Sequence, residues 1–351
     1  MGVSSGSIAA AANASELVAP RNHWIRSKEW DMTFIMLSAI LIALPLALNR
    51  YLGISRLYVA FGVTVLIGGP HMYATFTRTL MEKTFVKSHP LIMLGTLLVP
   101  VGVFVLGLNA FIVLLTVFFF WASIHVLHQV VYLVDCYNTK SPKTLSLQSR
   151  AIDYAVVLTS LYPIAFKRMV EGTFTIGSRS LLFPDFLRHD WVWQAALFIF
   201  VLSLVLFTAK TIQEAREGTV LWPKVLLIYI TAFAAFLIPT FNDLDVAFQG
   251  MNTWHSFQYL GLTWYVNRLR SERGEITSDF VQKISRSNWS YYGTVVAMTL
   301  GAGVIILFLW KVIGLEYEQC YYVTVLSFLL MHYLHDHVLF TDTEVLQPSA
   351  A

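Results

Sequence analysis

The sequence predicts an all-α, polytopic integral membrane protein with about ten transmembrane helices. Two observations lead to this class. Of the 351 residues, 56% are hydrophobic and 13% are charged, whereas a soluble domain has about 25% charged residues. The chain also contains many long apolar stretches, and a helix that crosses a bilayer needs about 20 mostly apolar residues. With two cysteines, the chain cannot be a small scaffold held together by disulfides.

Ten apolar segments divide the chain. The predicted helices cover 32–49, 57–78, 90–108, 110–135, 151–166, 191–212, 222–240, 244–266, 291–314 and 318–340. The fifth is short, and the third and fourth are nearly continuous, so nine spans is the alternative count. We expect residues 1–31 to form a flexible tail and interfacial segment, residues 32–340 a single transmembrane domain, and residues 341–351 a C-terminal tail.

The basic residues predict the orientation of the chain in the membrane. If the N-terminus is cytoplasmic, most Lys and Arg residues fall in segments on the cytoplasmic side, above all in 267–290. Because basic loops remain in the cytoplasm, we expect both termini to be cytoplasmic. The size of the chain favours a bacterial cytoplasmic (inner) membrane. A net charge of only +3 gives no reason to expect nucleic-acid binding.

Seven of the ten histidines fall inside predicted helices, although ionisable residues are costly in a membrane and usually mark a functional site. These are His71, His125, His128, His255, His332, His335 and His337. Each lies in the C-terminal half of the second, fourth, eighth or tenth predicted helix. The orientation above therefore places all seven at a similar depth near the cytoplasmic face.

The fourth and tenth helices share the pattern HxLHxxVxxxD, which begins at His125 and at His332. Each copy follows an upstream helix that carries one histidine, His71 for the first copy and His255 for the second. This arrangement predicts an internal pseudo-repeat. The helix of His255 also has a polar face that lipid would not tolerate, so it must line a cavity or contact other polar helices.

Clustered imidazoles predict a metal site, because neutral imidazole is a common ligand of iron, copper and zinc. The i, i+3 pairs are expected to supply the core ligands His125, His128, His332 and His335, with His71 and His255 completing the shell. Asp336 is expected to act as a ligand or to orient an imidazole. Tyr132 and Tyr259 are the candidate catalytic residues, as donors of hydrogen bonds or protons. Iron is the expected metal, as one ion or as two neighbouring ions.

The histidine segments HVLHQ, MHYLHDH, GGPHMYAT and NTWHSFQ resemble, in their arrangement, those of the membrane histidine-box oxygenases. This group includes fatty-acid desaturases, hydroxylases and the bacterial carotene-cleaving Brp/Blh-type enzymes. The resemblance implies a membrane oxygenase with a non-haem metal. It implies no role for any single residue.

The leading hypothesis is a non-haem metal oxidoreductase that acts with oxygen on a lipid or isoprenoid-like apolar small molecule from the bilayer. A redox partner is a possible addition, since the sequence itself has no Rossmann fingerprint and no CxxC motif. Two alternatives remain. Inward histidines on paired helices also suit a bis-histidine haem b electron-transfer protein. The polar eighth helix and the predicted repeat also suit a proton- or metal-coupled transporter.

Overall fold

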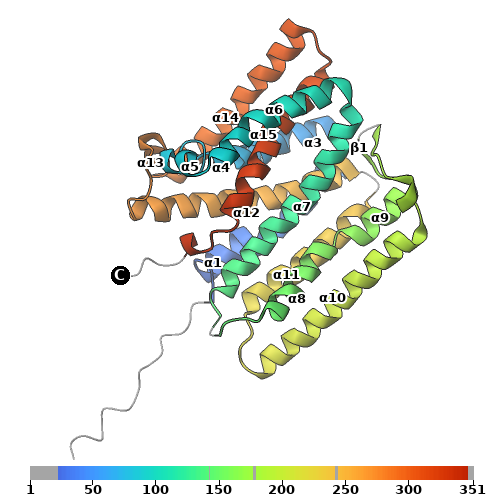
Figure 1. Cartoon of the computed structure of the whole chain (residues 1–351), viewed down its shortest axis with the longest axis vertical. Helices are drawn as coiled ribbons and strands as arrows, with labels where there is room; N and C mark the ends of the chain where they lie inside the picture. Colours follow the sequence, from blue (N-terminus) through green and yellow to red (C-terminus); the bar gives the residue numbers. More distant parts are fainter. Residues whose placement is uncertain (1–22, 142, 177–178, 242–243, 347–351) are drawn as a thin grey trace, which may run out of the picture.

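The computed structural model describes residues 23–141, 143–176, 179–241 and 244–346. These residues fold almost entirely into helices, together with one antiparallel pair of two-residue strands (Figure 1). The predicted tail over 1–22 and the end of the C-terminal tail over 347–351 lie outside the described residues.

The first half of the chain forms the elements up to the strand pair. They are α1 (Lys28–Asp31), η1 (Met32–Met36), η2 (Leu37–Ile42), α2 (Ala43–Arg50), α3 (Arg56–Val63), η3 (Thr64–Gly68), α4 (Gly69–Phe76), α5 (Lys83–Ser88), α6 (Pro90–Asn109), α7 (Phe111–Asn138), α8 (Leu147–Thr159), α9 (Tyr162–Val170), β1 (Thr175–Ile176) and β2 (Arg179–Ser180).

The second half is helical in its described part. Its elements are η4 (Asp185–Leu187), α10 (Asp190–Arg216), α11 (Trp222–Leu237), η5 (Ile238–Thr240), α12 (Leu244–Glu272), α13 (Asp279–Ile284), α14 (Asn288–Phe308), η6 (Leu309–Ile313), α15 (Tyr317–Leu339) and η7 (Glu344–Leu346).

Local sequence signals set several helix boundaries. Ser27, Ser55 and Ser146 precede α1, α3 and α8, and each side chain accepts a hydrogen bond from a backbone N–H of the first turn. Such caps satisfy donors that have no partner inside the helix. At the other end, Gly218 and Gly274 follow α10 and α12 with φ angles of 68° and 69°. Glycine adopts this left-handed conformation without a steric penalty, so the chain can turn there.

Each of the ten predicted apolar segments is helical, and seven helical segments among the described residues are long and apolar enough to cross a membrane. The seven are Lys28–Arg50, Arg56–Phe76, Pro90–Asn109, Phe111–Asn138, Asp190–Arg216, Trp222–Thr240 and Asn288–Ile313. They indicate an integral membrane protein.

The three other predicted spans differ for separate reasons. The segment 151–166 is divided between α8 and α9, since Pro163 lies in the first turn of α9 and a proline cannot continue a preceding helix. Helices α12 and α15 are long, but polar side chains lower their hydropathy. The count of seven therefore excludes the two helices that carry His255 and His332.

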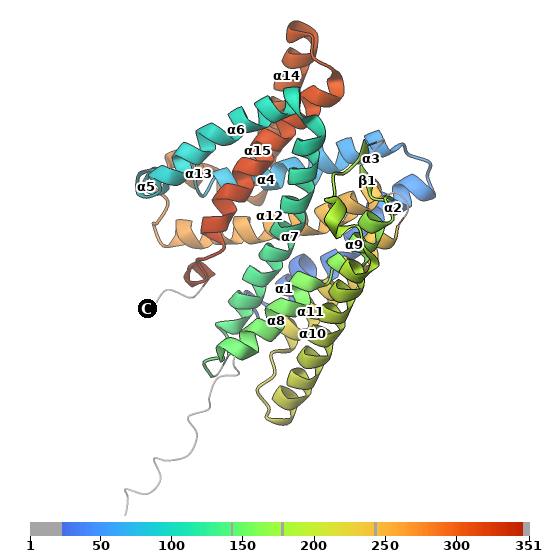
Figure 2. The same cartoon turned by 45° about the vertical axis from the view of Figure 1, so that its right-hand side comes forward.

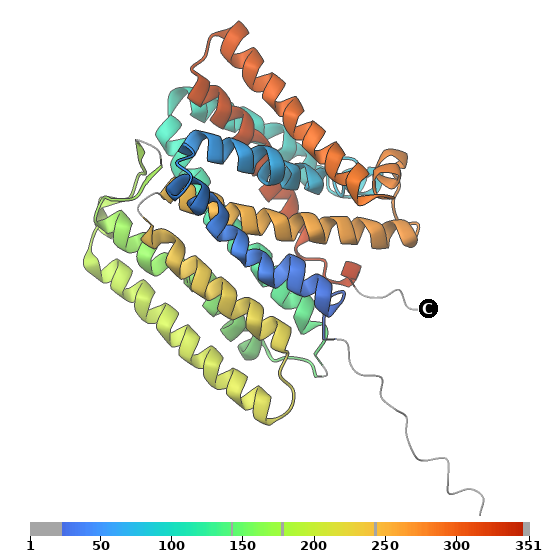
Figure 3. The same ribbon diagram turned by 180° about the vertical axis from the view of Figure 1, so that it is seen from behind.

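Helices α7 and α12 join two groups of helices. Helices α8 to α11 contact one another on one side of the molecule, while α4, α6, α14 and α15 contact one another on the other side (Figure 2). Seen from behind, α12 runs across the molecule beside the N-terminal helical segment (Figure 3). It contacts α2, α3, α4, α7 and η5. The polar helix α12 is thus enclosed by other helices, as the sequence analysis requires.

Close approach between α12 and the first helical segment depends on Gly250. A Cβ atom at this position would lie 2.4 Å from the backbone carbonyl oxygen of Ile42. A backbone atom cannot move aside as the end of a flexible side chain can. The helices can therefore keep this separation only if residue 250 has no side chain.

We predict that Gly250→Ala lowers the stability of the protein by about 1–3 kcal/mol, the usual cost of overpacking. The matched control is Gly102→Ala in α6, where a Cβ atom would have no neighbour within 4 Å. Thermal unfolding in detergent should show a lower midpoint for Gly250→Ala and no loss for Gly102→Ala. Equal midpoints for the two variants would contradict this account of the packing.

Candidate metal centre

Four histidines from four different helices meet in the interior. His71 lies on α4, His125 on α7, His255 on α12 and His332 on α15. One ring nitrogen of each lies within 4.8 Å of the corresponding nitrogen of every other. All four side chains are buried, with at most 4% of the residue exposed. We call these four residues the histidine group.

One ring nitrogen of each histidine in this group lacks the hydrogen-bond partner that a buried polar atom needs. Within the described part of the chain, the Nε2 atoms of all four histidines have no hydrogen-bond partner. Each buried polar atom left in this way costs about 1–3 kcal/mol. Nitrogen ligands lie about 2.0–2.1 Å from zinc, so two ligands on opposite sides of such an ion would be about 4.2 Å apart. The histidine group could therefore hold one metal ion with a small contraction.

The local backbone orients His71 toward the group. The π-helical segment η3 precedes α4, and Pro70 occupies the first turn of α4. The Nδ1 atom of His71 lies 2.5 Å from the carbonyl oxygen of Gly68 and 3.0 Å from Oγ of Ser256. A carbonyl oxygen only accepts, so Nδ1 carries the proton and donates it. The lone pair of Nε2 is then available for a metal.

A chain of hydrogen bonds orients His332. Its Nδ1 lies 2.6 Å from Oγ1 of Thr75, and this hydroxyl donates to Oδ1 of Asp336 at 2.9 Å. The hydroxyl of Tyr259 donates to the same carboxylate oxygen at 2.6 Å. Because the Thr75 proton goes to the carboxylate, the hydroxyl accepts from Nδ1 of His332. The Nε2 atom of His332 then carries no proton, and its lone pair is available to a metal.

Asp336 places a carboxyl group beside the histidine group. Its Oδ2 atom lies 3.5 Å from Nδ1 of His332 and 3.8 Å from Nε2 of His125. This carboxylate is fully buried. Four neutral imidazoles bring no charge to balance a cation, so an adjacent buried carboxylate stabilises a bound metal ion electrostatically.

Ring contacts hold His125 and His255. The ring of His125 stacks on Tyr333 with centroids 4.0 Å apart. The ring of His255 lies edge-on to His71 and to His125, at 5.1 Å from each. The carbonyl of His255 accepts a hydrogen bond from Nε2 of Gln129 on α7 at 3.1 Å, which ties the two helices together. Both ring nitrogens of His255 lack a hydrogen-bond partner among the described residues.

The remaining predicted ligands, His128 and His335, lie outside the histidine group. The ring of His128 contacts His337 and Phe340, with centroids 5.8 Å and 5.3 Å away. The Nε2 atom of His335 is hydrogen-bonded to Oγ1 of Thr96 at 2.8 Å. Helix geometry gives the reason. Residues three apart are offset by about 60° around the helix and about 4.5 Å along it, so one ring of each pair faces the centre and the other does not.

The two predicted tyrosines occupy different places. The ring of Tyr259 contacts His71 and His332, with centroids 5.6 Å and 5.5 Å away, and its hydroxyl reaches Asp336. The hydroxyl of Tyr132 instead donates to the backbone oxygen of Asp342 at 3.0 Å. Tyr259 therefore borders the histidine group, while Tyr132 joins α7 to the segment after α15.

Sequence reasoning missed several partners of the group. Thr75 was recognisable in part, since it lies one turn after His71 on the same face of the helix. Ser256 belongs to the polar face that the sequence predicts on the helix of His255, although its contact with His71 is not predicted. Tyr333 follows His332 directly, and no spacing rule selects it. The carbonyl of Gly68 is a backbone atom, so no side-chain pattern reveals it.

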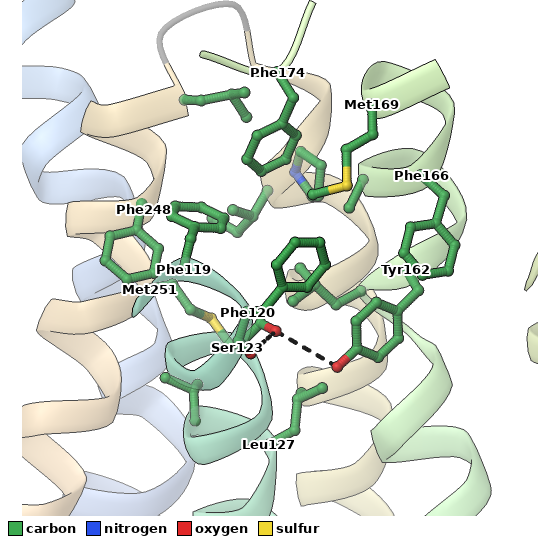
Figure 4. Close-up of a pocket in the computed structure, with 16 residues that line it drawn as sticks. Phe119, Phe120, Ser123, Leu127, Tyr162, Phe166, Met169, Phe174, Phe248 and Met251 are labelled. Carbon is green, nitrogen blue, oxygen red and sulfur yellow. Dashed lines mark hydrogen bonds between the residues drawn. The ribbon is translucent and has the colours of Figure 1, made fainter. Parts of the chain in front are cut away.

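An apolar cavity of about 50 Å³ lies next to this centre, between α7, α9, η5 and α12 (Figure 4). Its aromatic lining is Phe119, Phe120, Tyr162, Phe166, Phe174 and Phe248. The hydroxyls of Ser123 and Tyr162, 3.5 Å apart, give it one polar point. Met251, one helical turn before His255, and Val126, next to His125, also line it. The cavity therefore borders the helical turns that carry two of the four histidines.

Comparisons with known protein families, with curated proteins and with solved structures find no match to this chain. The function of the centre is therefore argued from its own geometry and chemistry.

We predict that alanine at His255 or His332 removes bound metal, because each substitution deletes one of four converging ligands. Alanine at His128 or His335, one turn along the same helices as His125 and His332, should leave the metal content unchanged. Elemental analysis of detergent-purified protein distinguishes the two sets. Metal loss confined to the His128 and His335 variants would contradict the assignment of the histidine group.

We also predict that Thr75→Val weakens metal binding about 10- to 100-fold, the usual effect of removing a hydrogen bond behind a ligand. The control is Thr96→Val, since Thr96 makes the same type of bond to His335 outside the group. Competition with a chelator measures the apparent affinity of each variant. If both variants bound metal equally well, the hydrogen-bond chain through Thr75 would have no part in the site.

Proposed function

We propose that this protein is a membrane-embedded, non-haem metal oxidoreductase of the oxygenase type, acting on a lipid or isoprenoid-like apolar substrate. The observation that carries the proposal is the convergence of four buried imidazoles, each with an Nε2 atom that has no hydrogen-bond partner among the described residues. The membrane-crossing helices around it and the apolar cavity beside it support the location and the class of substrate.

We propose iron as the metal, as a single ion. The donor set is four neutral nitrogens with one carboxylate nearby, and imidazole suits iron, copper and zinc alike. An ion that prefers six ligands would keep two positions open beside four histidines, as chemistry with oxygen requires. When bound, iron would supply the one-electron chemistry that amino-acid side chains lack. A second ion has less support, because His128 and His335 have other neighbours.

The protein's own residues would orient the ligands and exclude water. Gly68 and Thr75 hold the protons of two imidazoles on the nitrogen that faces away from the metal. Tyr259 shares a hydrogen-bond network with Thr75 and Asp336, so it is the residue suited to hold or deliver a proton at the centre. Tyr132 instead bonds to the backbone of Asp342, so we assign it a structural role.

The apolar cavity suits the substrate. Its aromatic lining would contact one segment of a hydrocarbon chain, and the Ser123–Tyr162 hydroxyls would offer one anchor for an oxygen atom. Lipid in the bilayer would supply such molecules directly, so the bilayer is also a partner. Electrons would come from a redox partner, because the chain has no dinucleotide fingerprint.

We further propose that all ten helical segments cross a bacterial inner membrane, with both termini cytoplasmic. Helices α12 and α15 need no lipid-compatible surface on the faces that neighbouring helices cover. The internal repeat also gains support, since corresponding positions are used alike. His125 and His332 belong to the histidine group, whereas His128 and His335 lie outside it.

The two alternatives have less support. The rings of His71 and His332 lie with centroids 4.5 Å apart, and those of His125 and His332 4.9 Å apart. A haem needs two opposed histidines with an open plane between them, and here other imidazoles occupy that space. A transporter needs a polar path from one side to the other, whereas the cavity beside the group is apolar.

Metal analysis and absorption spectroscopy of the purified protein test the proposal first. We expect about one iron per chain and no Soret band, since four histidines bind one ion. Oxygen consumption is then measured with a panel of long-chain lipids and isoprenoids. A Soret band would favour the haem alternative. Metal-free protein after expression with added iron would remove the basis of the proposal and direct work to proteoliposome uptake.

A cavity variant tests the substrate site. Ala165→Phe, on the α9 wall of the cavity, should reduce lipid-dependent oxygen consumption at least about tenfold by filling space, while iron content stays unchanged. Val101→Phe, at an exposed position of α6, serves as the control and should retain activity. If Ala165→Phe kept the full rate of lipid-dependent oxygen consumption, the substrate would not bind in this cavity.

A further inference from the structure

Arg78 is a buried charge for which the described part of the chain supplies no carboxylate partner. It lies in the turn after α4, where its backbone N–H donates to the backbone carbonyl of Thr75 at 2.9 Å. Only 8% of the residue is exposed. Among the described residues, no carboxylate oxygen lies within 4.0 Å of its guanidinium, and its Nε is buried without a hydrogen-bond partner. A buried charge is normally paired, because removal from water is costly.

The carboxylates near Arg78 are engaged elsewhere. Glu82, four residues later, accepts two hydrogen bonds from Thr277 and lies 3.6 Å from Arg270. Glu275 lies 4.0 Å from Arg270 and 3.7 Å from Arg273. Asp342 accepts hydrogen bonds from the backbone of η7. Burial, followed by the positive charge of Arg78, lowers the pKa of Arg270. The two guanidinium groups thus repel each other.

Arg78 lines an open polar cavity of about 520 Å³. Residues of α5 and of the C-terminal ends of α12 and α15 line it, and it shares no lining residue with the apolar cavity of Figure 4. Arg270 and Arg273 also line it, with Thr84, Ser88 and His89 as hydrogen-bonding side chains. Glu275, Asp342 and Glu344 complete its charged lining.

We propose that this cavity binds a phosphate or carboxylate group, which pairs with Arg78. A guanidinium offers parallel N–H donors that match the two oxygens of either anion. The anion would also relieve the repulsion between Arg78 and Arg270. The group could belong to a free anion or to the headgroup of an anionic lipid. This binding needs no metal, so it is independent of the proposed oxygenase activity.

The test measures binding of inorganic phosphate to the full chain in phosphatidylcholine nanodiscs, from the unfolding temperature at increasing phosphate and constant ionic strength. We expect a saturable rise for the wild type and for Arg268→Gln, a control at an exposed arginine on α12 that pairs with Glu272. Arg78→Gln should show no rise. Arg78→Lys, which keeps the charge but loses the fork, should bind phosphate about tenfold more weakly.

The source of the anion is distinguished in nanodiscs that contain phosphatidylglycerol. If a lipid headgroup occupies the site, native mass spectrometry should show this lipid retained by the wild type and not by Arg78→Gln, and phosphate should no longer raise the unfolding temperature. If a free anion binds, phosphate should act equally in both types of disc. Identical phosphate responses and lipid retention in the wild type and Arg78→Gln would overturn the proposal. We expect the iron content to be equal in all variants. A variant that keeps its iron but does not bind phosphate has lost the anion site while its metal centre is intact.

Discussion

The structure depends on the need to bring four imidazoles to one buried point. Apolar helices alone can pack in many ways, but polar nitrogens inside a membrane protein must find a partner. His71, His125, His255 and His332 come from four helices, so their convergence fixes how α4, α7, α12 and α15 cross. Two local departures from regular α-helical geometry and packing help to bring these helices together. The π-helical segment before Pro70 orients α4, and Gly250 lets α12 approach the N-terminal segment.

A carboxylate connects three of these helices behind the imidazoles. Asp336 on α15 accepts hydrogen bonds from Thr75 on α4 and Tyr259 on α12. A buried carboxylate is stable only with such donors or with a nearby cation. The same network therefore stabilises the packing and sets the proton positions of His332. The polar residues are concentrated where the helices cross because the same hydrogen bonds hold the helices together and orient His332.

Helix α12 orders the functional regions along one axis. Phe248 and Met251 line the apolar cavity near its start, His255 and Tyr259 belong to the centre, and Arg270 lines the charged cavity at its end. Its low hydropathy follows from this sequence of environments. A helix that lines an apolar cavity, a group of histidines and a charged cavity in turn cannot be uniformly apolar, and other helices must separate it from lipid.

The sequence by itself determined the helical membrane class and the concentration of histidines on four helices, because apolar length and intramembrane polarity are local properties. It also selected all four members of the histidine group, together with Asp336 and Tyr259. Only the tertiary structure decided which histidine of each i, i+3 pair faces the centre, since that depends on how each helix is rotated against its neighbours. The roles of Thr75 and of the Gly68 carbonyl, and the lack of a partner for Arg78, likewise depend on contacts between segments distant in the chain.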